Sequence, residues 1–146
     1  MELSRLSVVL ICLQFVLIAL ILWPFGTPRY GPIFWAGIIA GIALGIYTLL
    51  HNRLGNFNIR PEPKATAQLI VSGPYRVIRH PMYSALLLAA LAFVVAENIW
   101  LKVGLWIALG LVLSTKASFE EQLMSEKFSG YTSYRERTKR FIPYVF

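Results

Sequence analysis

The chain contains no aspartate, a single cysteine and only seven acidic residues, and these shortages exclude several kinds of site. Without aspartate there is no Ser–His–Asp catalytic set. Cys12 alone forms neither an internal disulfide nor a Cys/His metal cluster, so we expect no metal, and we interpret Cys12 as a small packed apolar residue. The sequence also has no Gly-rich phosphate loop.

Charge is scarce, and long hydrophobic runs take its place. Charged residues make up 14% of the chain and hydrophobic residues 57%, whereas a soluble domain is about a quarter charged. A helix that spans a bilayer needs roughly 20 apolar residues. Runs of about this length occupy residues 6–23, 32–50, 81–97 and 99–115, and the third reaches it only if its ends extend beyond the apolar stretch Met82–Ala96. The sequence therefore predicts an all-α, polytopic membrane protein with four transmembrane helices in a single domain, residues 1–146.

The net charge of +7 is distributed as expected for a membrane protein rather than for a nucleic-acid-binding protein. Basic residues concentrate between the second and third runs and after the fourth, and Arg5 precedes the first. Only Arg29 and Lys102 fall on the other side. Because basic residues favour the cytoplasmic side, we expect cytoplasmic N- and C-termini, a cytoplasmic loop at 51–80 and a cytoplasmic tail at 116–146. The short chain favours a prokaryotic inner (plasma) membrane.

The segments between the runs are unequal. The loop 51–80 is long for a structureless connection, and residues 65–71 within it are compatible with a short helix. The fourth helix is expected to continue past Lys116. The basic and aromatic end of the tail either lies against the anionic inner leaflet or folds back over the loop.

Gly37, Gly41 and Gly45 recur every four residues in the second run. Glycines on one face let another helix approach closely. We expect this face to pack against the first or the fourth helix, and a homodimer formed through it is the alternative.

Turn-forming and polar residues gather at residues 73–83, directly before the third run. Pro81 suits the first turn of a helix, which leaves His80 as the cap. The free N–H groups at a helix start attract a carboxylate or a phosphate, and Arg76 and Arg79 add positive charge. An equal alternative is that the arginines only anchor the helix to lipid phosphates and that His80 only caps it.

Glu120 and Glu121 supply negative charge just past the fourth run, with Lys116 one helical turn before Glu120. A Lys–Glu pair of this kind is usually a solvated surface pair. However, the short turn Glu97-Asn98 joins the third and fourth helices, so antiparallel packing places His80 at the depth of Lys116 and Glu120. The resulting ring of His, Arg, Lys, Glu and Tyr suits a zwitterionic small molecule.

Residues 51–146 resemble the isoprenylcysteine carboxyl methyltransferase and phospholipid methyltransferase superfamily. The first part of the resemblance is Leu69-Ile70, Gly73, Tyr75 and the element Arg79-His80-Pro81-x-Tyr83. The second part is Lys116 followed by Glu120-Glu121, and then Phe128, Tyr131, Tyr134 and Pro143. The chain departs from the usual pattern at Lys116, where Arg is usual, at Ala67, where His is frequent, and at Ser129, where Gly is usual.

The resemblance implies that S-adenosylmethionine binds at the cytoplasmic end of the last helices. The residues expected to contact this cofactor are Gln68, Leu69, Ile70, Gly73, Tyr75, His80, Pro81, Tyr83 and Glu120. As catalytic residues we expect Lys116, Glu121 and Arg79. Lys116 would orient the acceptor, and Glu121 or Tyr83 would take a proton from an ethanolamine-type ammonium.

The expected function is methyl transfer from S-adenosylmethionine to a lipid-like acceptor, with the carboxylate of an isoprenylcysteine-type acceptor favoured. N-methylation of an ethanolamine-type phospholipid is one alternative, and a non-catalytic lipid- or cofactor-binding scaffold is another. A small proton-coupled exporter is disfavoured because no carboxylate lies in the interior of the runs, Glu97 being only the last residue of the third. The expected partners are membrane lipids and an amphiphilic or prenylated acceptor, with no nucleic acid.

Overall fold

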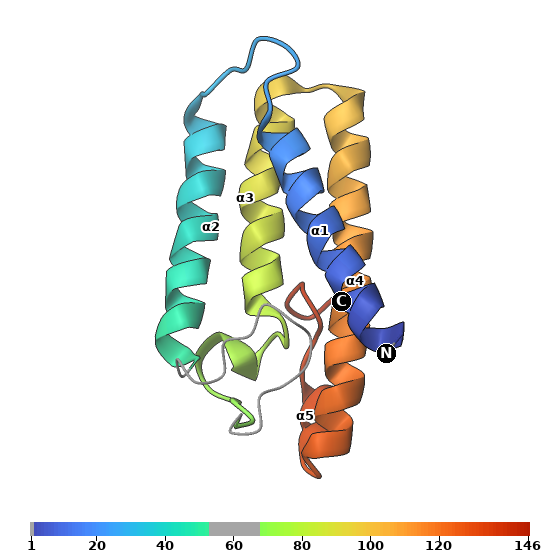
Figure 1. The fold of residues 1–146 in the computed structure, drawn as a ribbon. Coiled ribbons are helices and arrows are strands. Elements are labelled where there is room, and N and C mark those ends of the chain that lie inside the picture. Colours follow the sequence, from blue (N-terminus) through green and yellow to red (C-terminus); the bar gives the residue numbers. More distant parts are fainter. Residues whose placement is uncertain (1, 53–67) are drawn as a thin grey trace.

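The computed structural model describes residues 2–52 and 68–146, and this part of the chain is all-helical apart from one isolated β-bridge. Four long helices run antiparallel to their neighbours along the chain (Figure 1). They are α1 (Glu2–Leu22), α2 (Pro32–His51), α3 (Pro81–Glu97) and α4 (Trp100–Lys127). The short 3₁₀ helix η2 (Gly73–Arg76) precedes α3, and α5 (Tyr131–Arg137) follows α4. The predicted all-α class is confirmed.

Three of these helices, α1, α2 and α4, are long and apolar enough to cross a membrane. Large apolar side chains such as Phe15, Ile33 and Leu50 are exposed on them, which suits contact with lipid rather than water. The chain is therefore an integral membrane protein. Because α3 is apolar but has only 17 residues, the count of four spans stays a prediction.

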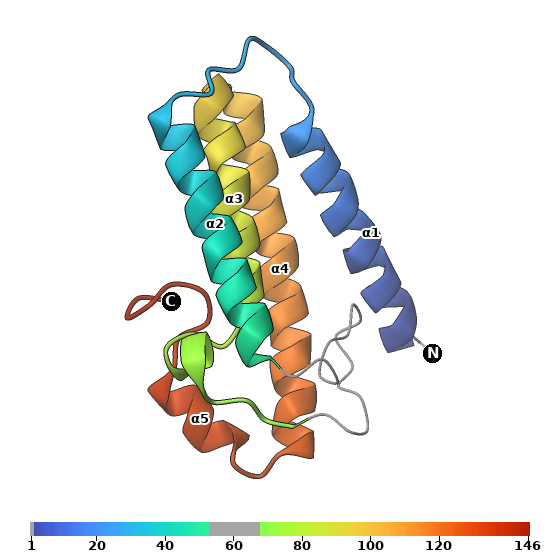
Figure 2. The same cartoon turned by 90° about the vertical axis from the view of Figure 1, so that its left-hand side faces the viewer.

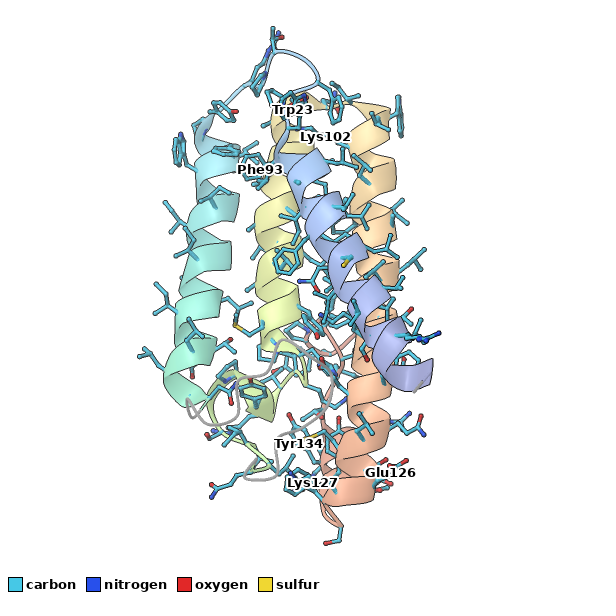
Figure 3. All side chains as sticks on the ribbon, viewed as in Figure 1. Trp23, Phe93, Lys102, Glu126, Lys127 and Tyr134 are labelled. Atoms are coloured by element: carbon cyan, nitrogen blue, oxygen red, sulfur yellow. The ribbon has the colours of Figure 1, made fainter. Side chains whose placement is uncertain are left out.

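A buried ion pair fixes the end of the bundle where α3 turns into α4. Asn98 takes the left-handed conformation there, with φ of 51°, which asparagine tolerates better than most residues. Lys102 Nζ lies 2.5 Å from Glu97 Oε1, and the other Glu97 oxygen accepts the N–H groups of Phe25 and Gly26. The pair thereby ties the α1–α2 connection to the α3–α4 turn, and Figure 3 shows Lys102 beside Trp23 at this end.

The glycine face of α2 packs against α3, so the expectation of α1 or α4 as its partner was wrong. Gly37 faces Ala92, and Gly41 faces Ala85 and Ala89. The reason is that α3 presents alanines where α2 presents glycines, which brings the two backbones close together. These glycines are thus covered within one copy of the chain, while the homodimer stays a prediction.

Gly41→Ala is expected to destabilise the protein by about 1–3 kcal/mol. An added Cβ would lie 2.9 Å from the Cβ of Ala89 and 3.0 Å from the carbonyl oxygen of Ala85. The matched control is Gly104→Ala in α4, where no atom lies within 4 Å of the added Cβ; removing a helical glycine there should stabilise by about 0.5–1 kcal/mol. Unfolding free energies in mixed micelles measure both, and equal effects would contradict the close packing of α2 on α3.

Two local expectations differ from the structure, and a third is confirmed. Cys12 is exposed on α1 instead of packed, because α1 contacts the bundle along one side only and Cys12 points away from it. Residues 68–71 are not helical, and residues 65–67 lie outside the described part of the chain. The continuation of the fourth helix is confirmed, since α4 extends to Lys127.

Candidate functional site

The C-terminal tail folds back and runs beside the segment that leads into α3, as the second of the two expectations for the tail had it. Ile78 and Lys139 form a parallel bridge. The N–H of Arg79 donates to the carbonyl of Lys139 at 2.7 Å, and the N–H of His80 donates to the carbonyl of Arg140 at 3.1 Å. Figure 2 shows the tail and η2 together at the end of the bundle opposite the α3–α4 turn. The backbone that presents His80 is therefore held by the tail as well as by α3.

Gly73 and Tyr134 fix η2 in front of α3. Gly73 has a φ of 57°, a conformation that favours glycine, and a Cβ at this position would collide with the ring of His51 at the end of α2. Tyr134 of α5 donates its hydroxyl hydrogen to the carbonyl of Tyr75 at 2.8 Å, and Figure 3 shows Tyr134 at this end of the molecule. The turn before His80 is thus set by contacts from both α2 and α5.

Glu121 is the centre of a buried charge cluster. Its side chain is 3% exposed, and Arg79 Nε donates to its Oε1 at 2.9 Å. Arg140 grips both carboxylate oxygens, Nε to Oε1 and Nη2 to Oε2, each at 3.1 Å. His80 Nε2 lies 3.1 Å from Oε1. A two-pronged guanidinium contact of this kind is strong and directional, so Glu121 holds the tail, the start of α3 and α4 together.

Glu120 is the more accessible carboxylate, with a side chain that is 23% exposed. Tyr83 donates its hydroxyl hydrogen to Glu120 Oε1 at 2.5 Å, and His80 Nδ1 lies 3.3 Å from Oε2. The rings of His80 and Tyr83 stack with centroids 5.5 Å apart. His80 and Tyr83, one turn apart on the same side of the helix start, therefore orient Glu120 toward the end of the bundle.

Both ring nitrogens of His80 face a carboxylate, an arrangement that favours the doubly protonated, charged imidazole. Burial opposes that charge, but the hydrogen bonds to Glu120 and Glu121 outweigh burial and raise the pKa of His80 above its ordinary value. Burial, followed by the charge of Glu120, raises the pKa of Tyr75 to about 12. Tyr75 therefore stays protonated, and its hydroxyl lies close enough to Glu120 to be affected by the negative charge.

Lys116 completes the site on the α4 side. Its side chain is buried, and its Nζ donates to Gln14 Oε1 of α1 at 2.6 Å. Nζ also lies 5.4 Å from the centre of the Tyr83 ring. Lys116 therefore joins α1 to the cluster formed by α3 and α4.

The structure brings together six of the predicted site residues: Arg79, His80, Tyr83, Lys116, Glu120 and Glu121. Tyr75 adjoins them through the charge of Glu120, and Pro81 is buried as the first residue of α3. Arg76, which was expected to add positive charge together with Arg79, is exposed at the end of η2. Gln68, Leu69 and Ile70 lie in the stretch that leads into η2, and their contact with a cofactor stays a prediction. Ala67 lies outside the described residues.

Three further residues shape the site and were missed: Gln14, His51 and Arg140. Arg140 is one of several basic residues in the tail, and only the fold-back singles it out. Gln14 had a signal, since an amide inside an apolar run is unusual. His51 had none, because its partner Gly73 is distant in the sequence.

The fold and the site together define the class of protein: a helical integral membrane protein with a buried mixed-charge cluster at one end of its bundle. The chain belongs to the phospholipid methyltransferase family, whose model matches residues 32–130, more than half of the chain. This match confirms the resemblance seen in the sequence. Both α1 and the tail beyond Gly130 lie outside it.

One curated relative is the nickel-cobalt-cadmium resistance protein NccN of Alcaligenes xylosoxydans xylosoxydans. It is 28% identical over 81 residues, which cover 55% of this chain and 38% of that protein. The matched region thus spans well under half of the relative's length. Among residues 2–52 and 68–146, no group of three or more His, Cys or Glu side chains is placed to hold a metal ion.

Proposed function

We propose that the protein transfers a methyl group from S-adenosylmethionine to a lipid-like acceptor at the end of the bundle where α3 begins, opposite the α3–α4 turn. Family membership supports methyl transfer. The observation that carries the proposal is the placement of His80 between two carboxylates, with Tyr83 orienting the more accessible one. In a membrane protein, a cluster of ionisable side chains at one helix start is typical of a site that binds a small charged molecule.

The donors and acceptors present fit this cofactor, which carries an ammonium, a carboxylate and a positively charged sulfur. Glu120 is partly exposed and has acceptor capacity beyond its bonds to Tyr83 and His80, so it suits the ammonium. The start of α3 suits the carboxylate. When bound, the cofactor supplies an activated methyl group. The residues that would hold it are the predicted set: Gln68, Leu69, Ile70, Gly73, Tyr75, His80, Pro81, Tyr83 and Glu120.

The remaining residues of the cluster align and shield the reactants, which is the main requirement of an in-line displacement. Arg79 and Arg140 fix Glu121, and Glu121 in turn fixes His80. Lys116 would orient the acceptor. We therefore assign Glu121 and Arg79 to positioning, because both oxygens of Glu121 already accept hydrogen bonds from cationic groups.

The favoured acceptor is the carboxylate of an isoprenylcysteine-type amphiphile. A carboxylate is already nucleophilic and needs no base, whereas an ethanolamine-type ammonium must first lose a proton. Neither candidate base is free to accept a proton. Glu121 accepts hydrogen bonds from Arg79 and Arg140, and the protonated hydroxyl of Tyr83 donates a hydrogen bond to Glu120. The name of the family favours the second candidate function, N-methylation of a phospholipid. A non-catalytic scaffold is the third, because Lys116 stands where Arg is usual.

The test uses the full chain in vesicles of its host's lipids, a prenylated thiol-carboxylate and S-adenosylmethionine with a tritiated methyl group. Label released by mild base indicates a methyl ester and supports the favoured function. Label that resists base and stays in the phospholipid headgroup supports N-methylation instead. Cofactor binding without transfer to any fraction indicates a scaffold and overturns the proposed activity.

A further inference from the structure

Two polar side chains from different membrane-spanning helices meet where their neighbours are apolar. Gln14 lies within α1, between exposed residues such as Leu13 and Phe15. Lys116 lies within α4 and is 3% exposed. The Nζ of Lys116 donates to Oε1 of Gln14 at 2.6 Å. Polar and charged residues inside spans are costly and usually serve a function.

The contacts of Lys116 with Gln14 and Tyr83 stabilise its charge without neutralising it. Gln14 is a neutral amide, and the Tyr83 ring, 5.4 Å from Nζ, supplies a cation–π contact. Within the described residues, no carboxylate oxygen forms a salt bridge with Nζ. Glu120, one helical turn away, acts on Lys116 through its charge without forming a salt bridge. A buried cation without a direct ion-pair partner is unfavourable, so this position suits an anionic group from outside the chain.

Gln14 changes what Lys116 offers to such an anion. A lysine alone is a point charge on a flexible stem, whereas an arginine presents two parallel donors. By accepting one N–H of Lys116 through Oε1, Gln14 fixes the ammonium and leaves its own Nε2 as a neighbouring donor. The pair therefore offers a fixed cation next to an amide donor, which is the pattern that a two-oxygen anion accepts.

We propose that Gln14 and Lys116 together bind the anionic oxygens of an amphiphile, and that Gln14 is a specificity-determining residue supplied by α1. The inference rests on the proposed function, because this amphiphile is the acceptor. The ligand chemistry is a carboxylate or a phosphodiester attached to an apolar chain. Lys116 precedes Glu120 by four residues, so their Cα atoms lie about 6 Å apart along the helix axis, and the anion site adjoins the proposed cofactor site. Gln14 is supplied by α1, which lies outside the region matched by the family model.

The test measures binding without the cofactor, by native mass spectrometry of the full chain in micelles. The probes are a prenylated thiol-carboxylate, phosphatidylethanolamine and, as a neutral amphiphile, diacylglycerol. Gln14→Leu should weaken binding of one or both of the probes that carry an anionic group, the carboxylate or the phosphodiester, about 10- to 100-fold, the effect of losing hydrogen bonds to a charged group, and leave diacylglycerol unchanged. Comparison of the prenylated thiol-carboxylate with phosphatidylethanolamine shows whether the site binds a carboxylate or a phosphodiester. Cys12→Leu, on the exposed side of α1, is the matched control and should change neither.

A rescue separates this role from a merely structural one. In the Lys116→Arg background the guanidinium provides both donors itself, so Gln14→Leu should there cost less than about threefold. An equal loss in both backgrounds, or an equal loss for diacylglycerol, would overturn the proposal. Anion preference without methyl transfer would uphold this site while the proposed function fails. Methyl transfer with normal acceptor affinity in Gln14→Leu would uphold the function while this site fails.

Discussion

Glu121→Ala is expected to destabilise the protein by about 3–5 kcal/mol, the cost of breaking a buried ion pair from one side. The substitution leaves the guanidinium groups of Arg79 and Arg140 without their anion, and it removes one of the two carboxylates that face the ring of His80. Arg79 and His80 are almost fully buried, so water cannot replace the lost carboxylate. The tail should be held less firmly at the start of α3, because Arg140 loses its two bonds to Glu121 and keeps only the bond to Ser118 of α4. Unfolding in mixed micelles measures the free energy, and limited proteolysis after Arg140 reports how firmly the tail is held.

The matched control is Glu126→Ala on the same helix. Glu126 is exposed and accepts a hydrogen bond from Gln122 in a solvated pair, so its loss should change stability by no more than about 0.5 kcal/mol. Glu121→Gln keeps the shape but removes the charge, and we expect an intermediate effect. If Glu121→Ala unfolds like Glu126→Ala and its tail stays protected, the charge cluster does not hold the tail.

The sequence predicted the parts of this site that depend on local pattern. The hydrophobic runs place the helices, because helix length and apolar composition follow from the bilayer. The two residues between α3 and α4 then force His80 and Glu120 to the same depth, and the structure places them in contact. The pairing of His80 with Glu121 follows from the same geometry.

What the sequence could not predict depends on which surfaces meet. Small residues on α2 indicate close packing, but not against which helix; the alanines of α3 decide that. The tail offers several basic residues, and only its bridge beside Ile78 brings Arg140 to Glu121. Gln14 reaches Lys116 because α1 packs mainly against α4, and α1 itself lies outside the family match. Such choices are made by long-range packing, which a local pattern does not encode.

The two adjacent carboxylates should separate stability from binding, and Glu120→Ala is the second prediction with a large effect. Because Glu120 is partly exposed and is bound by Tyr83 and His80 but by no arginine among the described residues, its loss should cost only about 1–2 kcal/mol of stability. Binding of S-adenosylmethionine should nevertheless fall by about 100-fold or more, since a buried ammonium contact with a carboxylate is worth roughly 3 kcal/mol. His80→Ala should weaken binding to a similar extent because it releases Glu120 from one side.

Calorimetry with S-adenosylmethionine and with its demethylated product measures these affinities, with Glu126→Gln as the control that leaves the site intact. Glu120→Gln keeps a side chain of the same shape that can still accept the hydrogen of Tyr83, yet carries no charge for an ammonium. If Glu120→Gln binds as weakly as Glu120→Ala, the charge itself is what the cofactor requires. Unchanged affinity in Glu120→Ala and His80→Ala would mean that neither side chain contacts the cofactor. The cofactor would then not bind between the start of α3 and the end of α4.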